Sequence, residues 1–163
     1  MAQLLIVYHS LTGGTAQMAQ AAAEGAREEG GVEVRLLAAA AAGPEALREA
    51  AGYLFACPEN LASMSGVMKD FFDRSYYPVL EELQGRAYAL AICAGSDGSN
   101  AARQIERIAT GWRLRAVAPP LIVCTHAQRP EEILAPKHIA AEALAQCREL
   151  GATLAAGLGL GIF

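Results

Sequence analysis

Residues 4–20 read LLIVYHSLTGGTAQMAQ. The first part, residues 4–8, is an unbroken apolar run, which is typical of a strand in a parallel sheet that is covered on both faces. After Gly13 and Gly14, small apolar residues recur three and four positions apart with glutamine and glutamate between them, as on an amphipathic helix. The stretch therefore predicts a buried strand, a short glycine-containing loop and a helix that starts at that loop.

The rest of the chain repeats this alternation of apolar runs and helical patterns. We expect further strands at residues 32–37, 53–57, 87–94 and 121–124. We expect helices at about residues 44–50, 65–76, 100–111 and 136–156. Pro58 is expected to end its strand, and Pro119 and Pro120 mark the last strand as an edge strand, because proline cannot donate to the ladder. Five strands alternating with helices predict an α/β fold with a parallel sheet and helices on both faces.

Length and composition predict a single domain spanning residues 1–163, with no membrane segment and no secretory signal, and hence a cytoplasmic location. The formal net charge is −4, and acidic and basic residues are mixed along the chain. This argues against nucleic acid as a partner, because there is no basic stripe to follow a phosphate backbone. The four cysteines are scattered without the spacing of a metal site, and we expect no metal.

The loop before the first helix has the composition of an anion site. Ser10, Thr12 and Thr15 supply hydroxyl groups, and two glycines let the backbone approach a ligand closely. The loop has no lysine or arginine and no Walker pattern G-x-x-x-x-G-K-[ST], which favours a single phosphate bound by neutral donors alone. On these residues alone, the loop fits equally well a hydroxyl helix cap with a tight turn.

The sequence lacks the residues that two other classes of protein with such folds require, the cysteine phosphatases and the response-regulator receivers. A cysteine phosphatase needs C-x-x-x-x-x-R, and no arginine stands six positions after Cys57, Cys93 or Cys124. A response-regulator receiver needs acidic residues after the first strand and an aspartate after the third, where this chain has His9, Ser10 and Cys57. We expect the three cysteines to be buried packing residues.

The chain resembles the flavodoxin-like superfamily in three separated loops. SLTGGT at residues 10–15 is similar to the T/S-x-T-G-x-T phosphate loop of flavodoxins. Residues 58–74 are similar to the P-x-x-x-x-x-x-S-G-x-x-K-x-F-x-D-R stretch of the NAD(P)H-dependent FMN reductase branch. Residues 93–98 fall where the superfamily places its second isoalloxazine loop. The resemblance implies a three-layer sandwich with a five-stranded parallel sheet in the order 2-1-3-4-5.

The resemblance also implies a site for non-covalent FMN. The phosphate loop would comprise Ser10, Leu11, Thr12, Gly13, Gly14 and Thr15. One side of the flavin ring would be lined by Pro58, Glu59, Asn60, Ser65 and Gly66, and the other by Ala94, Gly95 and Ser96. No catalytic residue is assigned, because the flavin would carry the redox chemistry.

Two departures from flavodoxins bear on function. Neither ring loop contains Phe, Tyr or Trp, and the chain is not strongly acidic. We therefore expect an oxidoreductase that passes electrons from NAD(P)H through FMN to a quinone, free flavin or similar small-molecule acceptor. The alternatives are a single-electron carrier that docks a redox partner protein, and a flavin-binding module without turnover. Enzymes of this kind are often oligomeric, and we expect a homo-oligomer.

Overall fold

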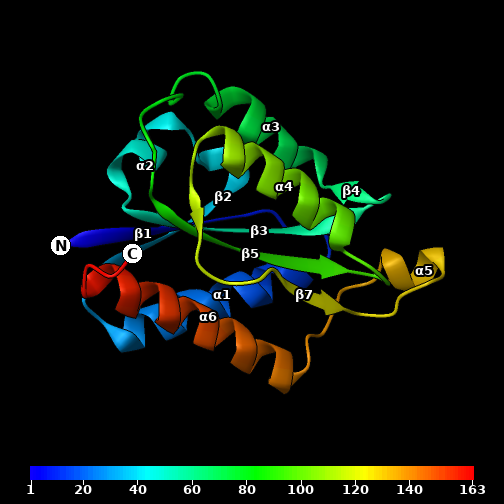
Figure 1. Cartoon of the computed structure of the whole chain (residues 1–163). Coiled ribbons are helices and arrows are strands. Elements are labelled where there is room, and N and C mark those ends of the chain that lie inside the picture. Colours follow the sequence, from blue (N-terminus) through cyan, green and yellow to red (C-terminus); the bar gives the residue numbers. More distant parts are fainter.

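The computed structural model describes residues 1–163, which form one sheet between two layers of helices (Figure 1). The strands are β1 (Ala2–Tyr8), β2 (Val32–Ala38), β3 (Gly52–Asn60), β4 (Ser63–Met64), β5 (Ala87–Ala94), β6 (Arg115–Ala116) and β7 (Leu121–Cys124). The helices are α1 (Gly14–Glu29), α2 (Pro44–Glu49), α3 (Gly66–Ser75), α4 (Ser99–Gly111), α5 (Pro130–Ile133) and α6 (Ala141–Gly159), with a 3₁₀ turn at Ala39–Ala41. None of these helices is both long enough and apolar enough to cross a membrane.

The sheet has the predicted order. β2, β1, β3 and β5 lie side by side and parallel, and β7 continues the sheet along the end of β5. The five expected strands thus follow the order 2-1-3-4-5. The expected number of strands is wrong, because β6 pairs with the start of β5 and β4 pairs antiparallel with β3. Both extra strands have two residues, too few to produce a readable hydrophobic alternation.

Each face of the sheet has its own apolar core. In Figure 1, α2, α3 and α4 cover one face, and α1 and α6 cover the other. The two helices α1 and α6 cross at glycines. A Cβ at Gly25 would lie 2.1 Å from the carbonyl oxygen of Arg148, and one at Gly151 would lie 1.9 Å from that of Ala22. The backbones can therefore approach closely only because both positions lack side chains.

Two local predictions are wrong. Pro58 does not end β3, which continues to Asn60; β1 pairs with β3 only as far as Ala56, so β3 has an open side where a proline is tolerated. The last helix begins at Ala141 rather than 136, and α5 was not expected. In α3, Met68, Phe71 and Phe72 are buried, whereas Val67 is 39% exposed.

Candidate FMN site

The candidate site lies at the carboxyl edge of the sheet, where β1, β3 and β5 end next to one another. The chain leaves β1 for β2 on one side and reaches β3 on the other, so the strand order reverses between these strands. Ligands of open parallel sheets bind at such a reversal. The topology therefore brings together the three loops that the sequence singled out, at residues 9–15, 58–66 and 94–98.

The phosphate loop has unpaired donors at the start of α1. The helix has no side-chain cap, and the residue before it, Gly13, has a φ of +92°, a conformation that favours glycine. The backbone N–H of Gly13 donates to Ser10 Oγ at 3.1 Å. Thr15 is 2% exposed, and its hydroxyl has no oxygen or nitrogen partner; the polar group beside it is the Cys93 thiol, which is a weak hydrogen-bond partner. A buried hydroxyl is costly when left unpaired, so this one indicates a ligand.

The hydroxyl groups of this loop are suited to a ligand that only accepts hydrogen bonds. Ser10 Oγ accepts from Gly13, Thr12 Oγ1 accepts from the ammonium of Lys137 at 3.3 Å, and Thr15 Oγ1 has no oxygen or nitrogen partner. Each hydroxyl has one proton and two lone pairs, so all three still have a proton to donate. A phosphate monoester offers acceptor oxygens to such a cluster. The residues present therefore fit the phosphate group of FMN.

Lys137 is the main site residue that sequence reasoning missed. The prediction that only neutral donors face the loop is wrong, because the segment before α6 lies against it. The N–H of Lys137 donates to the carbonyl of Thr12 at 2.8 Å, and Gln17 Nε2 donates to the carbonyl of Lys137 at 2.8 Å. The N–H of Ile139 donates to Gln17 Oε1 at 3.1 Å. These bonds keep residues 136–140 out of the helix, and nothing in the local sequence signals them.

Gly14 is required by packing against this segment and against β5. A Cβ at Gly14 would lie 2.8 Å from Cys93 Sγ and 3.4 Å from Lys137 Cβ. Cys93 is buried, as predicted, and burial raises the pKa of its thiol. The thiol therefore acts as a neutral packing group beneath the loop.

On the ring side, β3 and β4 form a hairpin that α4 holds in place. Its turn residues, Leu61 and Ala62, have φ values of 51° and 61°, and Leu61 is fully exposed. Asn100 Nδ2 donates to the carbonyl of Ala62 at 2.5 Å, and Gln104 Oε1 accepts from the N–H of Met64 at 2.8 Å. Sequence reasoning missed both side chains, because they lie about 40 positions from their partners.

The side chain of Glu59 binds the N-terminus of α4. Its two carboxylate oxygens accept from the N–H of Gly98 at 2.9 Å and the N–H of Ala101 at 3.0 Å. It thus caps the helix N-terminus, where a negative charge is favourable. The carboxylate expected at the ring is therefore turned toward the helix, and it ties the hairpin to the other ring loop.

The second ring loop, residues 94–98, is fixed by the chain that follows β7. The N–H of Thr125 donates to the carbonyl of Ala94 at 2.9 Å, and the N–H of His126 donates to that of Gly95 at 2.8 Å. Gly98 has a φ of +87°, and a Cβ there would lie 2.7 Å from the side chain of Ile122. Ser96 is exposed at the tip.

His9 joins the phosphate loop to the start of α3. Its Nδ1 lies 2.8 Å from Ser65 Oγ, and Ser65 is buried. Burial lowers the pKa of His9, which favours the neutral imidazole. Gly66, next to Ser65, is exposed, and a Cβ there would meet nothing within 4 Å.

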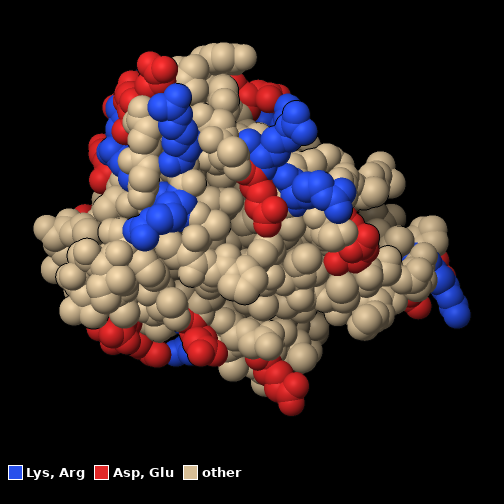
Figure 2. All heavy atoms as spheres, in the orientation of Figure 1, with Lys and Arg blue, Asp and Glu red and all other residues tan.

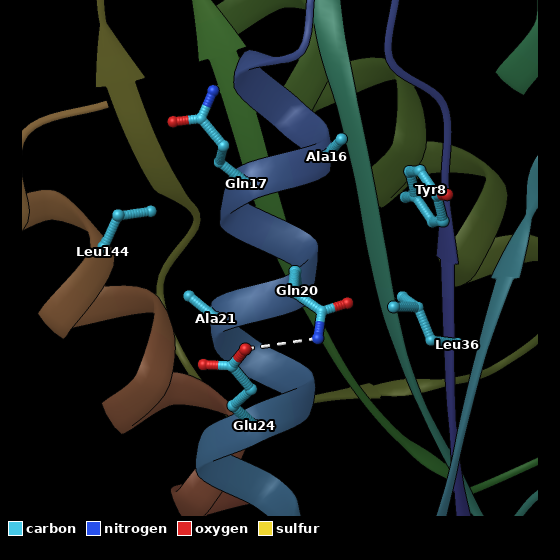
Figure 3. A pocket seen from close by; sticks show the side chains of 8 residues that line it. All are labelled: Tyr8, Ala16, Gln17, Gln20, Ala21, Glu24, Leu36 and Leu144. Carbon is cyan, nitrogen blue, oxygen red and sulfur yellow. Dashed lines mark hydrogen bonds between the residues drawn. The ribbon is translucent and has the colours of Figure 1, made fainter. Parts of the chain in front are cut away.

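Two surface hollows flank the phosphate loop without being the ring site. The first, about 460 Å³, lies between α1, the end of β1 and β2; Figure 3 shows Tyr8 and Leu36 on one side and Gln20, bonded to Glu24, on α1. The second, about 690 Å³, borders β7 and Lys137. Neither is lined by residues 58–66 or 94–98, so neither is the predicted ring-binding surface.

The fold and this edge of the sheet define a flavodoxin-like protein, and comparison with known proteins identifies the family. The model for NADPH-dependent FMN reductase matches residues 38–128, more than half of the chain. The chain belongs to this family. The match contains both ring loops and excludes the phosphate loop, whose assignment rests on its geometry.

Curated relatives include flavodoxins and proteins named NAD(P)H dehydrogenase (quinone). A flavodoxin of Aquifex aeolicus is 37% identical over 101 residues, which are 61% of this chain and 55% of the relative. An NAD(P)H dehydrogenase (quinone) of Acidithiobacillus ferrooxidans is 34% identical over 95 residues, which are 46% of this chain and 48% of the relative. The chain thus spans about half the length of the curated relatives it matches.

Solved structures bear out the fold. A flavodoxin from the domain Archaea superposes with a TM-score of 0.79 at 21% identity, covering 96% of this chain and 98% of the other. A flavodoxin, WrbA-like protein from Agrobacterium tumefaciens superposes with a TM-score of 0.75 at 19% identity, covering 99% of each chain. The flavodoxin-like α/β sandwich predicted from the sequence is confirmed.

Proposed function

We propose that residues 1–163 form one FMN-dependent oxidoreductase domain that takes electrons from NAD(P)H and delivers them to a quinone or a similar small acceptor. The observation that carries the FMN-binding part of the proposal is the buried hydroxyl of Thr15, which has no oxygen or nitrogen partner and lies at the uncapped start of α1. It supports a bound phosphate group independently of the family match.

The chain's own groups would divide the binding of FMN between two regions. The hydroxyls of Ser10, Thr12 and Thr15 and the free N–H groups of the first turn of α1 would bind the phosphate. The backbones of residues 58–60, 65–66 and 94–96 would enclose the ring. When bound, the flavin supplies hydride and electron transfer, and the surrounding backbone groups orient it and stabilise charge on it.

Access to the ring supports an enzyme rather than a carrier. Neither ring loop has an aromatic side chain, which leaves a ring face open to a nicotinamide or a quinone. The relatives named NAD(P)H dehydrogenase (quinone) support this reading. The relatives named flavodoxin support the carrier as a second candidate. Against the carrier, Figure 2 shows basic and acidic side chains interspersed on one face, without a continuous acidic docking surface there.

Anaerobic titration of the FMN-loaded protein with NADPH and then NADH, followed at 450 nm, tests the proposal. Complete bleaching by either nucleotide, and its reversal by a quinone, is the expected result. If neither nucleotide bleaches the flavin, while stepwise dithionite reduction gives a stable one-electron state, the protein is a carrier. The absence of both responses would leave a binding module without turnover.

A further inference from the structure

Lys137 is a half-buried cation that no carboxylate neutralises. Its ammonium donates to the carbonyls of Ile133 at 2.8 Å and Ala135 at 2.6 Å and to Thr12 Oγ1 at 3.3 Å, and it makes no ion pair. The chain has one other lysine, Lys69, which is exposed and paired with Asp73 at 2.7 Å. Partial burial of an unpaired charge is unfavourable unless a counter-charge arrives.

The position of Lys137 points to the counter-charge. Its ammonium contacts the phosphate loop, and the same loop contains the buried, unpaired Thr15 hydroxyl. Three features thus converge at the start of α1: an unneutralised cation, a buried donor without an acceptor, and uncapped helical N–H groups. Each one is unfavourable by itself, and each is stabilised by an anion.

Lys137 also orients Thr12. By donating to Thr12 Oγ1, the ammonium occupies a lone pair of that oxygen, which leaves the hydroxyl proton to be donated to another group. A neighbouring positive charge polarises the O–H bond and strengthens the hydrogen bond that it donates. A lysine that acts through a threonine is a positioning residue as well as a source of charge.

We propose that Lys137 is the cation of the phosphate site: it neutralises the bound phosphate and directs the Thr12 hydroxyl toward it. This rests on the proposed binding of FMN. It makes the protein discriminate FMN from riboflavin through a residue that lies 122 positions after the phosphate loop, because Lys137 follows Thr15 by that distance along the chain. The loop that looks neutral in the sequence becomes a charged site in the fold.

The test is the affinity of FMN and of riboflavin, measured by flavin fluorescence, for matched variants. Lys137→Met and Lys137→Gln both remove the charge, and the glutamine can still donate to the neighbouring carbonyls. Both are expected to weaken FMN binding at least about tenfold, because they remove the positive charge beside the bound phosphate, and to change riboflavin binding less than about twofold, because riboflavin has no phosphate. Lys69→Met is the matched control and should leave both affinities unchanged.

A double-mutant cycle separates the two roles of Lys137. If the lysine acts partly through Thr12, then Thr12→Val with Lys137→Met should lose less FMN affinity than the product of the single losses. Equal loss of both flavins in the two charge-removing variants would overturn the proposal, as would no loss of either. Melting temperatures of the flavin-free proteins show whether a variant has merely unfolded.

Inorganic phosphate distinguishes this proposal from the proposed function. At equal ionic strength, phosphate in place of chloride should raise the melting temperature of the flavin-free wild type and not that of Lys137→Gln. Failure of wild-type protein to bind FMN would overturn the proposed function, while a phosphate effect lost in Lys137→Gln would still support the anion site. The same phosphate effect in both proteins would contradict the role of Lys137.

Discussion

Glu59→Ala removes the carboxylate that accepts from two N–H groups at the start of α4, and leaves there only the carboxylate of Asp97, which accepts from the N–H of Ser99 at 3.1 Å. The variant leaves the N–H groups of Gly98 and Ala101 without the acceptors that now lie at 2.9 and 3.0 Å. Loss of a helix cap costs about 0.5–2 kcal/mol, and loss of a favourable charge at a helix N-terminus adds about 0.3–1 kcal/mol. We expect a loss of about 2 kcal/mol, near the middle of that range because Glu59 is half-exposed.

Thermal and urea unfolding of the flavin-free protein measure this loss. For a chain of this length, about 2 kcal/mol corresponds to a fall of roughly 4–8 °C in Tm. Glu59→Gln should lose about half as much, because its amide retains one acceptor oxygen. Glu131→Ala is the control, because that exposed side chain makes no hydrogen bond or ion pair.

The same variant should loosen the ring loops and spare the phosphate loop. We therefore expect Glu59→Ala to weaken FMN and riboflavin by similar factors. A Tm within 1 °C of wild type, which is about 0.3–0.5 kcal/mol, would refute the capping role. A loss confined to FMN would refute the separation of ring and phosphate regions.

Three further predictions concern the loop, the helix crossing and the thiols. Thr15→Val should leave the flavin-free protein as stable or up to about 1 kcal/mol more stable, because a buried unpaired hydroxyl is removed, and should weaken FMN binding; lower stability would contradict the unpaired state. Gly25→Ala should cost about 1–3 kcal/mol in urea unfolding because its Cβ meets backbone of α6, while Gly66→Ala, with open space around it, should not destabilise. Burial raises the pKa of Cys57 to about 12, so iodoacetamide should modify the part-exposed Cys124 before Cys57. The free energy of unfolding should fall as pH rises from about 9 toward 12, because the Cys57 thiol ionises at lower pH in the unfolded chain than in the folded one. Unchanged stability across that range would contradict the assignment.

The fold was largely predictable because its signals are local. The run at residues 4–8 and the other long strands are continuous apolar segments, and their alternation with helices restricts the topology. The start of α6 was not predictable. Residues 136–140 lead into a segment with a helical pattern, so the sequence predicts that they belong to the helix. The hydrogen bond from the N–H of Lys137 to the carbonyl of Thr12 instead holds them against the phosphate loop. Tertiary hydrogen bonds of this kind leave no periodic pattern.

The site residues that could be predicted are those that lie next to one another in the sequence. The glycines and hydroxyls of residues 10–15 are contiguous, so their chemistry is readable in the sequence. Asn100, Gln104 and Lys137 reach the site from distant segments, and a lone lysine or glutamine has no distinguishing neighbours. Glu59 was predicted to line the ring, and its carboxylate binds the start of α4. The predicted homo-oligomer stays a prediction.

Paired titrations of purified wild-type protein with FMN and riboflavin test whether the loop at residues 10–15 binds the phosphate of FMN. A phosphate that makes several charge-assisted hydrogen bonds should make FMN bind at least about a hundredfold more tightly than riboflavin, with one FMN per chain. Equal affinities for the two flavins, or no binding of either, would contradict it.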